Sequence, residues 1–252
     1  MRTSDRLSIG YADRRYADER RQGAHIAAGQ HESIWGWSSA AGRLRADRRA
    51  RFVIQAAGLR PGIRCLELGC GTGAFTSRLI ESRCELVAVE ISDALAERCR
   101  ERVGDRAEVV VGNIETGEGL DGTFDAIVGV SVLHHVNMDL CLRNTFSLLR
   151  EGGRYAFSEP NMANPEVWAA RNIDFVGRFM RATPHETAFR TRELRGLFER
   201  AGLVVEVCEP FEFLHPATPA ALIGAMRRVE SFLEGTPARR IAGSVRIAGR
   251  KP

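Results

Sequence analysis

The stretch 65–74 constrains the fold of this chain more than any other, because it holds Gly69, Gly71 and Gly73 within five residues. Residues 63–68, which lead into these glycines, are largely apolar, as a buried parallel strand should be. The apolar residues after the glycines recur at helical spacing. Each glycine would cost a helix interior about 1 kcal/mol relative to alanine. A strand-to-helix turn instead uses glycine to bend sharply and to let a ligand come close. The free N–H groups at the start of the following helix favour a polar or anionic ligand. The turn therefore predicts a nucleotide-like cofactor.

The length of 252 residues suits one large α/β domain with additions. No apolar run approaches the roughly 18 residues that a membrane span needs, and the first residues lack the apolar core of a signal peptide. We therefore expect a cytoplasmic protein. The six cysteines contain no C-x-x-C pair, so neither a metal site nor a disulfide framework is expected.

Strands and helices alternate between residues 63 and 160, with strands expected at 63–68, 85–91, 107–111, 124–130 and 154–158. Repeated βα units of this length predict an α/β fold of Rossmann-like type, doubly wound around a mostly parallel sheet. Further strands are expected at 204–213 and 241–248, and helices at 43–57, 167–180, 191–202 and 219–233.

The regions outside this core predict the domain organisation. Residues 1–58 combine polar sequence with aromatic side chains and are expected to form a helical arm that covers a pocket. Residues 59–252 then form the catalytic domain. Residues 161–191 form a lid-like insertion after the fifth strand, where ligands bind in open α/β sheets, and 217–236 form a helical insertion.

Two cofactors fit the glycine turn itself. The spacing Gly69-x-Gly71-x-x-Ala74 satisfies the dinucleotide fingerprint, and Glu90 lies about twenty residues further on, at the end of the second strand. A carboxylate at that place binds the ribose hydroxyls of any adenosine-bearing cofactor. These features alone leave NAD and S-adenosylmethionine both open.

Residues flanking the turn resemble one family. Glu67-Leu68-Gly69-Cys70-Gly71-Thr72-Gly73 resembles motif I of the class I S-adenosylmethionine-dependent methyltransferases, E/D-x-G-x-G-x-G. Val89–Ser92 resembles motif II, and Leu148–Gly153 resembles the "LkpGG" that leads into the fifth strand. The resemblance covers about residues 60–160 by motif and 192–252 by topology, and it implies a seven-stranded sheet with an antiparallel last strand. It also implies S-adenosylmethionine as cofactor and S-adenosylhomocysteine as product.

The resemblance further implies which residues bind the cofactor. The turn and the acid before it face the methionine part, Glu90 holds the ribose, and residues after the second and third strands address adenine. Asn113 stands where many members carry Asp. The implied residues are Glu67, Gly69, Cys70, Gly71, Gly73, Glu90, Ile91, Asn113, Ile114, Val130 and Ser131.

Catalytic residues are less fixed in such enzymes, because the sulfonium methyl is already activated and the protein mainly aligns the acceptor. His134 and His135 follow the fourth strand and are the candidates for a general base, with packing as the alternative role. Candidate acceptor-binding residues come from the arm, from the end of the fifth strand and from its insertion. They are His31, Trp35, Trp37, Glu159 and His185.

The acceptor is inferred by exclusion. The fourth strand is followed by Ser131-Val132-Leu133-His134, not by the Pro-Pro-Tyr-like turn of enzymes that methylate base amino groups. We predict methyl transfer to a small molecule, most simply at oxygen, with nitrogen and carbon open. Neither a nucleic acid nor a membrane partner is expected, and a homodimer is left open. The alternatives are an RNA- or protein-directed methyltransferase that uses the basic residues of 1–51, a non-catalytic binding protein, and an NAD-dependent oxidoreductase.

Overall fold

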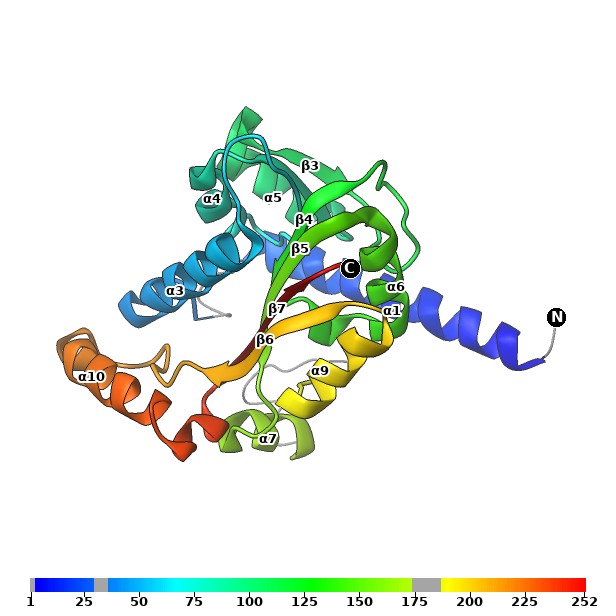
Figure 1. The fold of residues 1–252 in the computed structure, drawn as a ribbon. Helices are drawn as coiled ribbons and strands as arrows, with labels where there is room; N and C mark the ends of the chain where they lie inside the picture. Colours follow the sequence, from blue (N-terminus) through cyan, green and yellow to red (C-terminus); the bar gives the residue numbers. More distant parts are fainter. Residues whose placement is uncertain (1–2, 30–35, 174–186) are drawn as a thin grey trace.

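The computed structural model describes residues 3–29, 36–173 and 187–252, and Figure 1 shows their arrangement. The elements of the first half are α1 (Thr3–Ala28), α3 (Ala40–Ala57), β1 (Arg64–Leu68), α4 (Thr76–Leu79), η1 (Ile80–Ser82), β2 (Glu85–Glu90), α5 (Asp93–Val103), η2 (Gly104–Arg106), β3 (Glu108–Val111) and β4 (Phe124–Val130). Those of the second half are η3 (Leu133–His135), α6 (Met138–Leu148), β5 (Leu149–Pro160), α7 (Pro165–Asn172), α9 (Thr191–Arg200), β6 (Val204–Phe211), η4 (Ala220–Leu222), α10 (Ile223–Glu234), η5 (Pro237–Ile241) and β7 (Ser244–Arg250).

One seven-stranded sheet organises the molecule, in the order β3-β2-β1-β4-β5-β7-β6. Strands β1 to β5 run parallel to one another, and β7 runs antiparallel to both β5 and β6. The strand order reverses between β1 and β4, which is the place where open α/β sheets bind ligands. The predicted Rossmann-like fold, with its antiparallel last strand, is confirmed.

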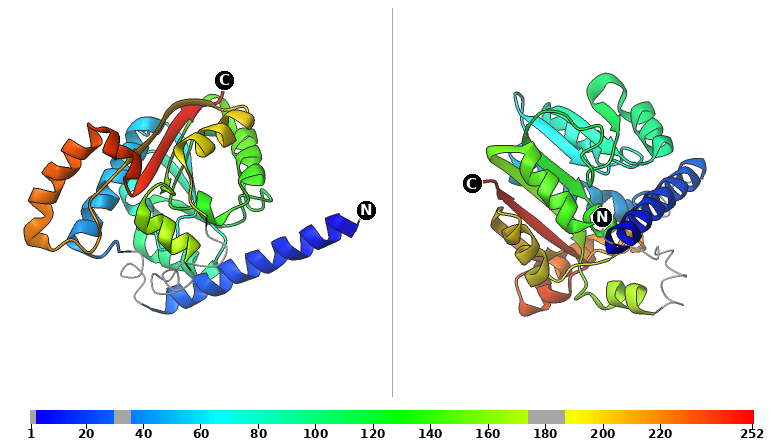
Figure 2. Two further views of the ribbon diagram at one scale, coloured as in Figure 1. Left: turned by 90° about the horizontal axis from the view of Figure 1, so that it is seen from below. Right: turned by 90° about the vertical axis from the view of Figure 1, so that its right-hand side faces the viewer.

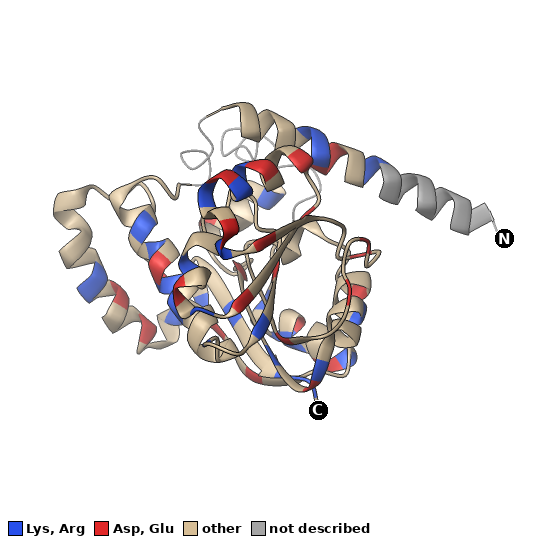
Figure 3. Cartoon of the chain, turned by 90° about the horizontal axis from the view of Figure 1, so that it is seen from above, with Lys and Arg blue, Asp and Glu red and all other residues tan. Residues whose placement is uncertain are grey.

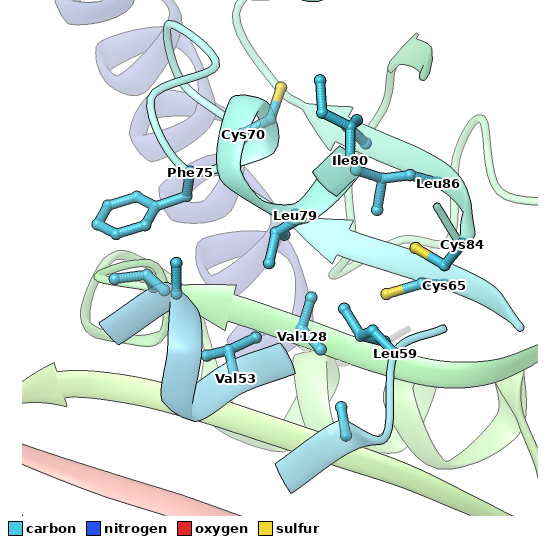
Figure 4. Packing of buried hydrophobic residues seen from close by; sticks show 14 of the residues in the cluster. Val53, Leu59, Cys65, Cys70, Phe75, Leu79, Ile80, Cys84, Leu86 and Val128 are labelled. Carbon is cyan, nitrogen blue, oxygen red and sulfur yellow. The ribbon is translucent and has the colours of Figure 1, made fainter. Parts of the chain in front are cut away.

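Helices cover both faces of the sheet (Figure 1). One face carries α3, α4 and α5, and its core includes Val53, Leu79 and Cys99. Figure 4 shows part of this core, with side chains of β1 and β4 packed against the helices. The other face carries α6 and α9, with Leu142 and Phe198 fully buried against the sheet. Strands buried on both faces explain the continuous apolar runs of the sequence.

The carboxyl-terminal part of α1 packs on α5 through Ile26, Ala27 and Leu95. The amino-terminal part of the same helix projects beyond the rest of the molecule (Figure 2). Helix α3, which follows it, contributes Ala46, Ala50 and other buried residues to the main core. The division into an arm (1–58) and a domain (59–252) remains a prediction.

The surface offers two further observations. In the view of Figure 3, arginines and acidic residues are interspersed along the chain instead of forming one basic face. Among the helices within residues 3–29, 36–173 and 187–252, none has the length and apolar content required to cross a membrane.

Several element boundaries differ from expectation. Strand β5 begins at Leu149, not at 154, because Leu149 already pairs with Phe124 and the residues around Gly152 form an irregularity in the ladder. The last strand is Ser244–Arg250, since Pro237–Ile241 forms a 3-10 helix. The helix after the glycine turn, expected over about 73–82, begins only at Thr76. The helix expected at 167–180 is seen as Pro165–Asn172, and the rest of that prediction extends outside the described residues.

Candidate active site

A cavity of about 800 Å³ lies at the carboxyl ends of β1, β2 and β4, bordered by α1, α3 and α7. Its volume falls within the range of small-molecule sites, roughly 300–1,000 Å³. The wall contains the glycine turn, the ends of several strands and side chains of three helices. Its charged members are Arg15, Glu19, Arg45, Arg49, Glu90, Glu115 and Arg171.

The glycine turn brings backbone close to this cavity. Gly69 and Gly71 have φ values of 65° and 54°, which residues other than glycine rarely adopt. A Cβ atom on Gly69 would lie 2.5 Å from Cγ2 of Val132. The Gly69 and Cys70 N–H groups donate to the carbonyl of Val89, at 2.9 and 3.2 Å, which fixes the turn against β2. Only glycine therefore fits at position 69.

Glu90 ends β2 beside this turn. One oxygen, Oε2, accepts the Gly71 N–H at 2.9 Å, and Oε1 accepts the Ser92 N–H at 3.0 Å. Burial raises the pKa of Glu90 above its ordinary value, and these two N–H groups oppose that rise. A carboxylate has about four lone-pair sites, so Glu90 keeps acceptor capacity for hydroxyl groups in the cavity.

A buried cluster closes the end of the cavity near β3. Glu115 forms an ion pair with Arg15 of α1, and it accepts hydrogen bonds from the Tyr16 hydroxyl at 3.0 Å and the Asn137 N–H at 3.0 Å. Asn113 accepts the Glu115 N–H at 2.9 Å. Arg15 also donates to the carbonyl of His135 at 2.8 Å. Helix α1 thus forms one wall of the site.

His134 lines the cavity and is held from behind by Glu159. Its Nδ1 lies 2.7 Å from Oε2 of Glu159. The other oxygen of Glu159 accepts the N–H groups of Val132 and Leu133, both at 3.0 Å, so the carboxyl group also fixes the turn η3. A carboxylate can only accept, so this network places the ring proton on Nδ1 and the lone pair on Nε2. This tautomer suits a general base.

Two arginines of α3 share one carboxylate beside the cavity. Glu212 accepts from Arg45, at 2.8 and 3.0 Å, and forms an ion pair with Arg49. Burial alone would raise the pKa of Glu212, but the two guanidinium groups lower it. Arg49 also donates to the Ser131 hydroxyl at 3.1 Å. The guanidinium carbons of both arginines lie over the Trp37 ring, 5.0 and 5.3 Å from its centroid.

This cluster leaves positive charge on the cavity wall. Two guanidinium groups face a single buried carboxylate, and burial lowers the pKa of Arg45. Within the described residues, Nη1 of Arg45 has no hydrogen-bond acceptor. The nearby Glu166 is ion-paired with His215 at 3.0 Å. An anionic group in the cavity would therefore balance this positive charge.

Comparison with known proteins addresses the family. Residues 66–155 match a family model described as "Methyltransferase domain". The UbiE ubiquinone/menaquinone biosynthesis C-methyltransferase of Pasteurella multocida is 36% identical over 124 residues, which are 44% of this chain and 46% of that protein. Residues 66–155 of this chain therefore resemble the methyltransferase domain that the sequence predicts. The chain spans about half the length of the curated relatives it matches.

Solved methyltransferase structures share the fold. The N-methyltransferase NodS of Bradyrhizobium japonicum, in complex with S-adenosylhomocysteine, has a TM-score of 0.62 at 16% identity and covers 93% of this chain and 98% of its own. Magnesium protoporphyrin IX methyltransferase of Synechocystis, with bound S-adenosylmethionine, has a TM-score of 0.58 at 10% identity, with 93% and 97% covered. The family model supports the predicted family over residues 66–155, and the solved structures confirm the predicted fold.

The cavity brings together most of the residues that the sequence nominated. Ligand contacts of these residues remain predictions. The nominated residues that line it are Trp37, Gly69, Cys70, Gly71, Glu90, Ile91, Asn113, Ile114, Val130, Ser131, His134 and His135. Gly73 does not line it, and its φ of 78° and close approach to Cys99 indicate a packing role. His31, Trp35 and His185 lie outside the described residues.

One nomination is corrected by the structure. Glu159 was expected to contact the acceptor, but its side chain is fully buried behind His134 and does not line the cavity. Both of its oxygens are bonded to the protein. Glu159 is therefore a positioning residue for His134.

Glu67 also does not line the cavity and lies buried beside Thr76. Burial raises the pKa of Glu67 to about 8, and its Oε2 has no hydrogen-bond partner among the described residues. The carboxyl group is therefore protonated at neutral pH. A direct charge contact from Glu67 to the cofactor is not supported by this placement.

Glu67→Gln is expected to remove part of the pH dependence of stability. The folded chain keeps the Glu67 proton up to about pH 8, whereas the unfolded chain releases it near pH 4.5. The contribution of Glu67 to the free energy of unfolding is fully present below pH 4.5. It falls by on the order of 1 kcal/mol per pH unit between pH 4.5 and about pH 8. Urea unfolding between pH 5 and 8 should show that the free energy of unfolding of Glu67→Gln rises relative to that of the wild type as the pH increases. A constant difference between the two free energies of unfolding across this pH range would contradict the raised pKa of Glu67.

Sequence reasoning missed the charged clusters. Glu115 lies far along the chain from Arg15 and Tyr16, and Glu212 lies far from Arg45 and Arg49. The arginine spacing in α3 was the available indication, because residues four apart lie on one helix face. Their acidic partner Glu212, which directly follows β6, could not be identified without the sheet order.

Proposed function

We propose that this chain transfers a methyl group from S-adenosylmethionine to a small acceptor whose attacked atom carries an acidic proton, with His134 as general base. The observation that carries this proposal is the 2.7 Å contact between His134 Nδ1 and the buried Glu159 carboxyl group, with the imidazole ring in the cavity wall. When bound, the cofactor supplies an activated methyl group on its sulfonium.

The residues of the cavity fit the three parts of that cofactor. Glu90 keeps lone pairs for ribose hydroxyls, and the Gly69 turn brings backbone to the cavity wall. Asn113 and Ile114 border the adenine end. Arg45 offers N–H donors to a carboxylate, and the methionine part of the cofactor carries one. We assign these four contacts as proposals.

His134 then takes the acceptor proton as the methyl group is transferred. Glu159 orients the ring and stabilises the imidazolium that results. An amine that is already deprotonated needs no such base, so a hydroxyl or an acidic C–H is favoured. Oxygen is our first assignment. Carbon is the second, because the curated relatives are named C-methyltransferases.

An assay with ¹³C-methyl-labelled S-adenosylmethionine tests the proposal. The purified chain is incubated with a panel of phenols, carboxylic acids and 1,3-dicarbonyl compounds. Formation of S-adenosylhomocysteine together with a labelled product supports the proposal, and the NMR signal of the new methyl group tells oxygen from carbon. Methylation of RNA or protein, with none of any small compound, would contradict it.

Arg45→Met is expected to lower the affinity for S-adenosylhomocysteine by about tenfold, because one charge-assisted contact to the carboxylate is lost. Affinity for 5′-methylthioadenosine, which lacks the amino-acid part, should be unchanged. Arg43→Met is the matched control, since Arg43 is an exposed residue of the same helix. Calorimetry with both ligands measures the difference. Equal losses for the two ligands would refute the carboxylate contact.

A further inference from the structure

Ser131, the residue that follows β4, is held in a backbone conformation that favours glycine. Its φ is 56°, in the left-handed region. Among the described residues other than glycine that have a positive φ, Ser131 alone lines the cavity. Its N–H donates to the carbonyl of Ser158 at 2.8 Å, which fixes Ser131 against β5. Strained residues of this kind concentrate at functional sites, so we asked what the Ser131 side chain can do.

Arg49 lies beside the Ser131 hydroxyl. Its side chain is 4% exposed, and its Nη1 donates to Oγ of Ser131 at 3.1 Å. The same guanidinium group donates to Oγ of Ser244 and forms an ion pair with Glu212. One buried arginine thus joins the end of β4 to the residue after β6 and to the first residue of β7. It also places a positive charge next to the Ser131 oxygen.

The two serine hydroxyls on Arg49 differ in where their own protons go. A hydroxyl has one proton to donate and two lone pairs that accept. Ser244 accepts from Arg49 and donates its proton to Oε2 of Glu212 at 3.2 Å. Ser131 also accepts from Arg49, but no acceptor for its own proton lies among the described residues. Because Ser131 is part of the cavity wall, this proton can be donated to a ligand.

The charge of Arg49 selects the kind of ligand atom. It polarises the Ser131 O–H group and strengthens a hydrogen bond to an oxygen that carries negative charge. The ammonium and sulfonium groups of the cofactor are cations, so the same charge disfavours both as partners. The cofactor carboxylate is assigned to Arg45. An anionic oxygen of the methyl acceptor is therefore the partner that this donor fits.

Ser131 also lies close along the chain to the proposed base. Ser131 and His134 are three residues apart, on either side of a turn whose N–H groups are held by Glu159. Both residues line the cavity. One acceptor molecule can therefore lie against the imidazole ring and the hydroxyl group at the same time.

We propose that the Ser131 hydroxyl donates a hydrogen bond to the acceptor oxygen that becomes negatively charged when His134 removes a proton. In a phenol, the O–H proton moves to Nε2 of His134 and the electron pair stays on the oxygen. In a 1,3-dicarbonyl compound, the C–H proton moves to Nε2 and the electron pair of that bond moves onto a carbonyl oxygen. Ser131 and Arg49 stabilise this negative charge until methyl transfer removes it.

This role narrows the acceptor class. Phenols and enolisable dicarbonyl compounds need both a base and a donor to the oxygen that the base leaves charged. A carboxylic acid is already ionised at neutral pH, so neither residue would help it. The inference rests on the proposed function, because it takes His134 as the base.

Two variants remove the hydroxyl and differ in their effect on the backbone. Ser131→Ala keeps a residue other than glycine at a φ of 56°, whereas Ser131→Gly relieves that strain. Equal losses in both variants would therefore exclude a weakened fold as the cause. Ser158→Ala is the matched control, because Ser158 lies beside Ser131 on β5, is fully buried and does not line the cavity.

The first measurement needs no turnover. The para-nitrophenolate ion absorbs visible light, so the ionisation of para-nitrophenol can be followed in the presence of the full chain and saturating S-adenosylhomocysteine. We expect the wild type and Ser158→Ala to lower the pKa of the bound phenol by about one unit or more relative to water. Both Ser131 variants should lose about tenfold or more of that ionisation equilibrium. Affinity for S-adenosylhomocysteine should stay unchanged in all of them.

The second measurement is kcat with the best phenol of the small-molecule panel. It should fall by about tenfold or more in both Ser131 variants, as expected for the loss of one donor to a developing oxyanion. The fall should be larger for phenols of higher pKa, whose oxyanions need more stabilisation. A general weakening of the fold would lower kcat equally for all of them.

A wild type that leaves the ionisation of para-nitrophenol unchanged, or Ser131 variants that keep the wild-type shift, would overturn the inference. Loss of S-adenosylhomocysteine affinity in the Ser131 variants would also overturn it, because the hydroxyl would then bind the cofactor. Absence of methyl transfer to any small compound by the wild type would instead count against the proposed function, and the optical titration would still report on Ser131.

Discussion

Glu159→Gln is expected to lower kcat for methyl transfer by about a thousandfold while leaving the affinity for S-adenosylhomocysteine unchanged. The glutamine oxygen can still accept the N–H groups of Val132 and Leu133, so the turn η3 is kept. Its amide nitrogen, however, would donate to Nδ1 of His134, where the carboxylate now accepts. The imidazole proton must then move to Nε2, and the ring can no longer take a proton from the acceptor.

The tautomer can be measured without the acceptor. The ¹⁵N chemical shifts of the His134 ring should show a protonated Nδ1 in the wild type and a protonated Nε2 in the variant. The matched control is Glu151→Gln, since Glu151 is an exposed residue of the same strand. Turnover is followed with the best acceptor from the small-molecule panel. Wild-type turnover in Glu159→Gln, or an unchanged tautomer, would refute the role of His134 as the base.

Glu90→Ala should weaken binding of S-adenosylhomocysteine by about a hundredfold or more. Two hydrogen bonds from ribose hydroxyls to a buried carboxylate are worth roughly 1.5–3 kcal/mol each, and each 1.4 kcal/mol is about a factor of ten. The variant also loses the tether between Glu90 and the Gly71 N–H, which orders the turn. Both effects act in the same direction.

Glu85→Ala is the control for this second variant. Glu85 begins the same strand, and its side chain is 69% exposed at the end away from the cavity. Calorimetry on both variants separates loss of a binding carboxylate from loss of any charge on β2. Thermal unfolding confirms that each variant is folded. Wild-type affinity in Glu90→Ala would exclude the ribose contact.

The sheet and the donor half of the site could be predicted because their determinants are local. An apolar strand, a glycine turn and an acid at the end of the next strand lie within 63–90, and parallel strands bring their carboxyl ends to one edge. The same reasoning identified His134 and His135, because both directly follow β4.

The rest of the site depends on contacts between distant parts of the chain. From the sequence, Glu159 is expected at an exposed strand end. Only the packing of η3 on β5 shows that it is buried behind His134. The sequence predicts only that Arg45 and Arg49 share one face of a basic helix. The structure shows that both pair with Glu212, which follows β6. Non-local pairing of this kind leaves no periodicity in the sequence.

Calorimetric titration of the purified chain with S-adenosylhomocysteine and, separately, with NAD tests the central claim most directly. The glycine turn, Glu90 and Arg45 predict one-site binding of S-adenosylhomocysteine and no measurable binding of NAD. Binding of NAD in the absence of S-adenosylhomocysteine binding would contradict the account.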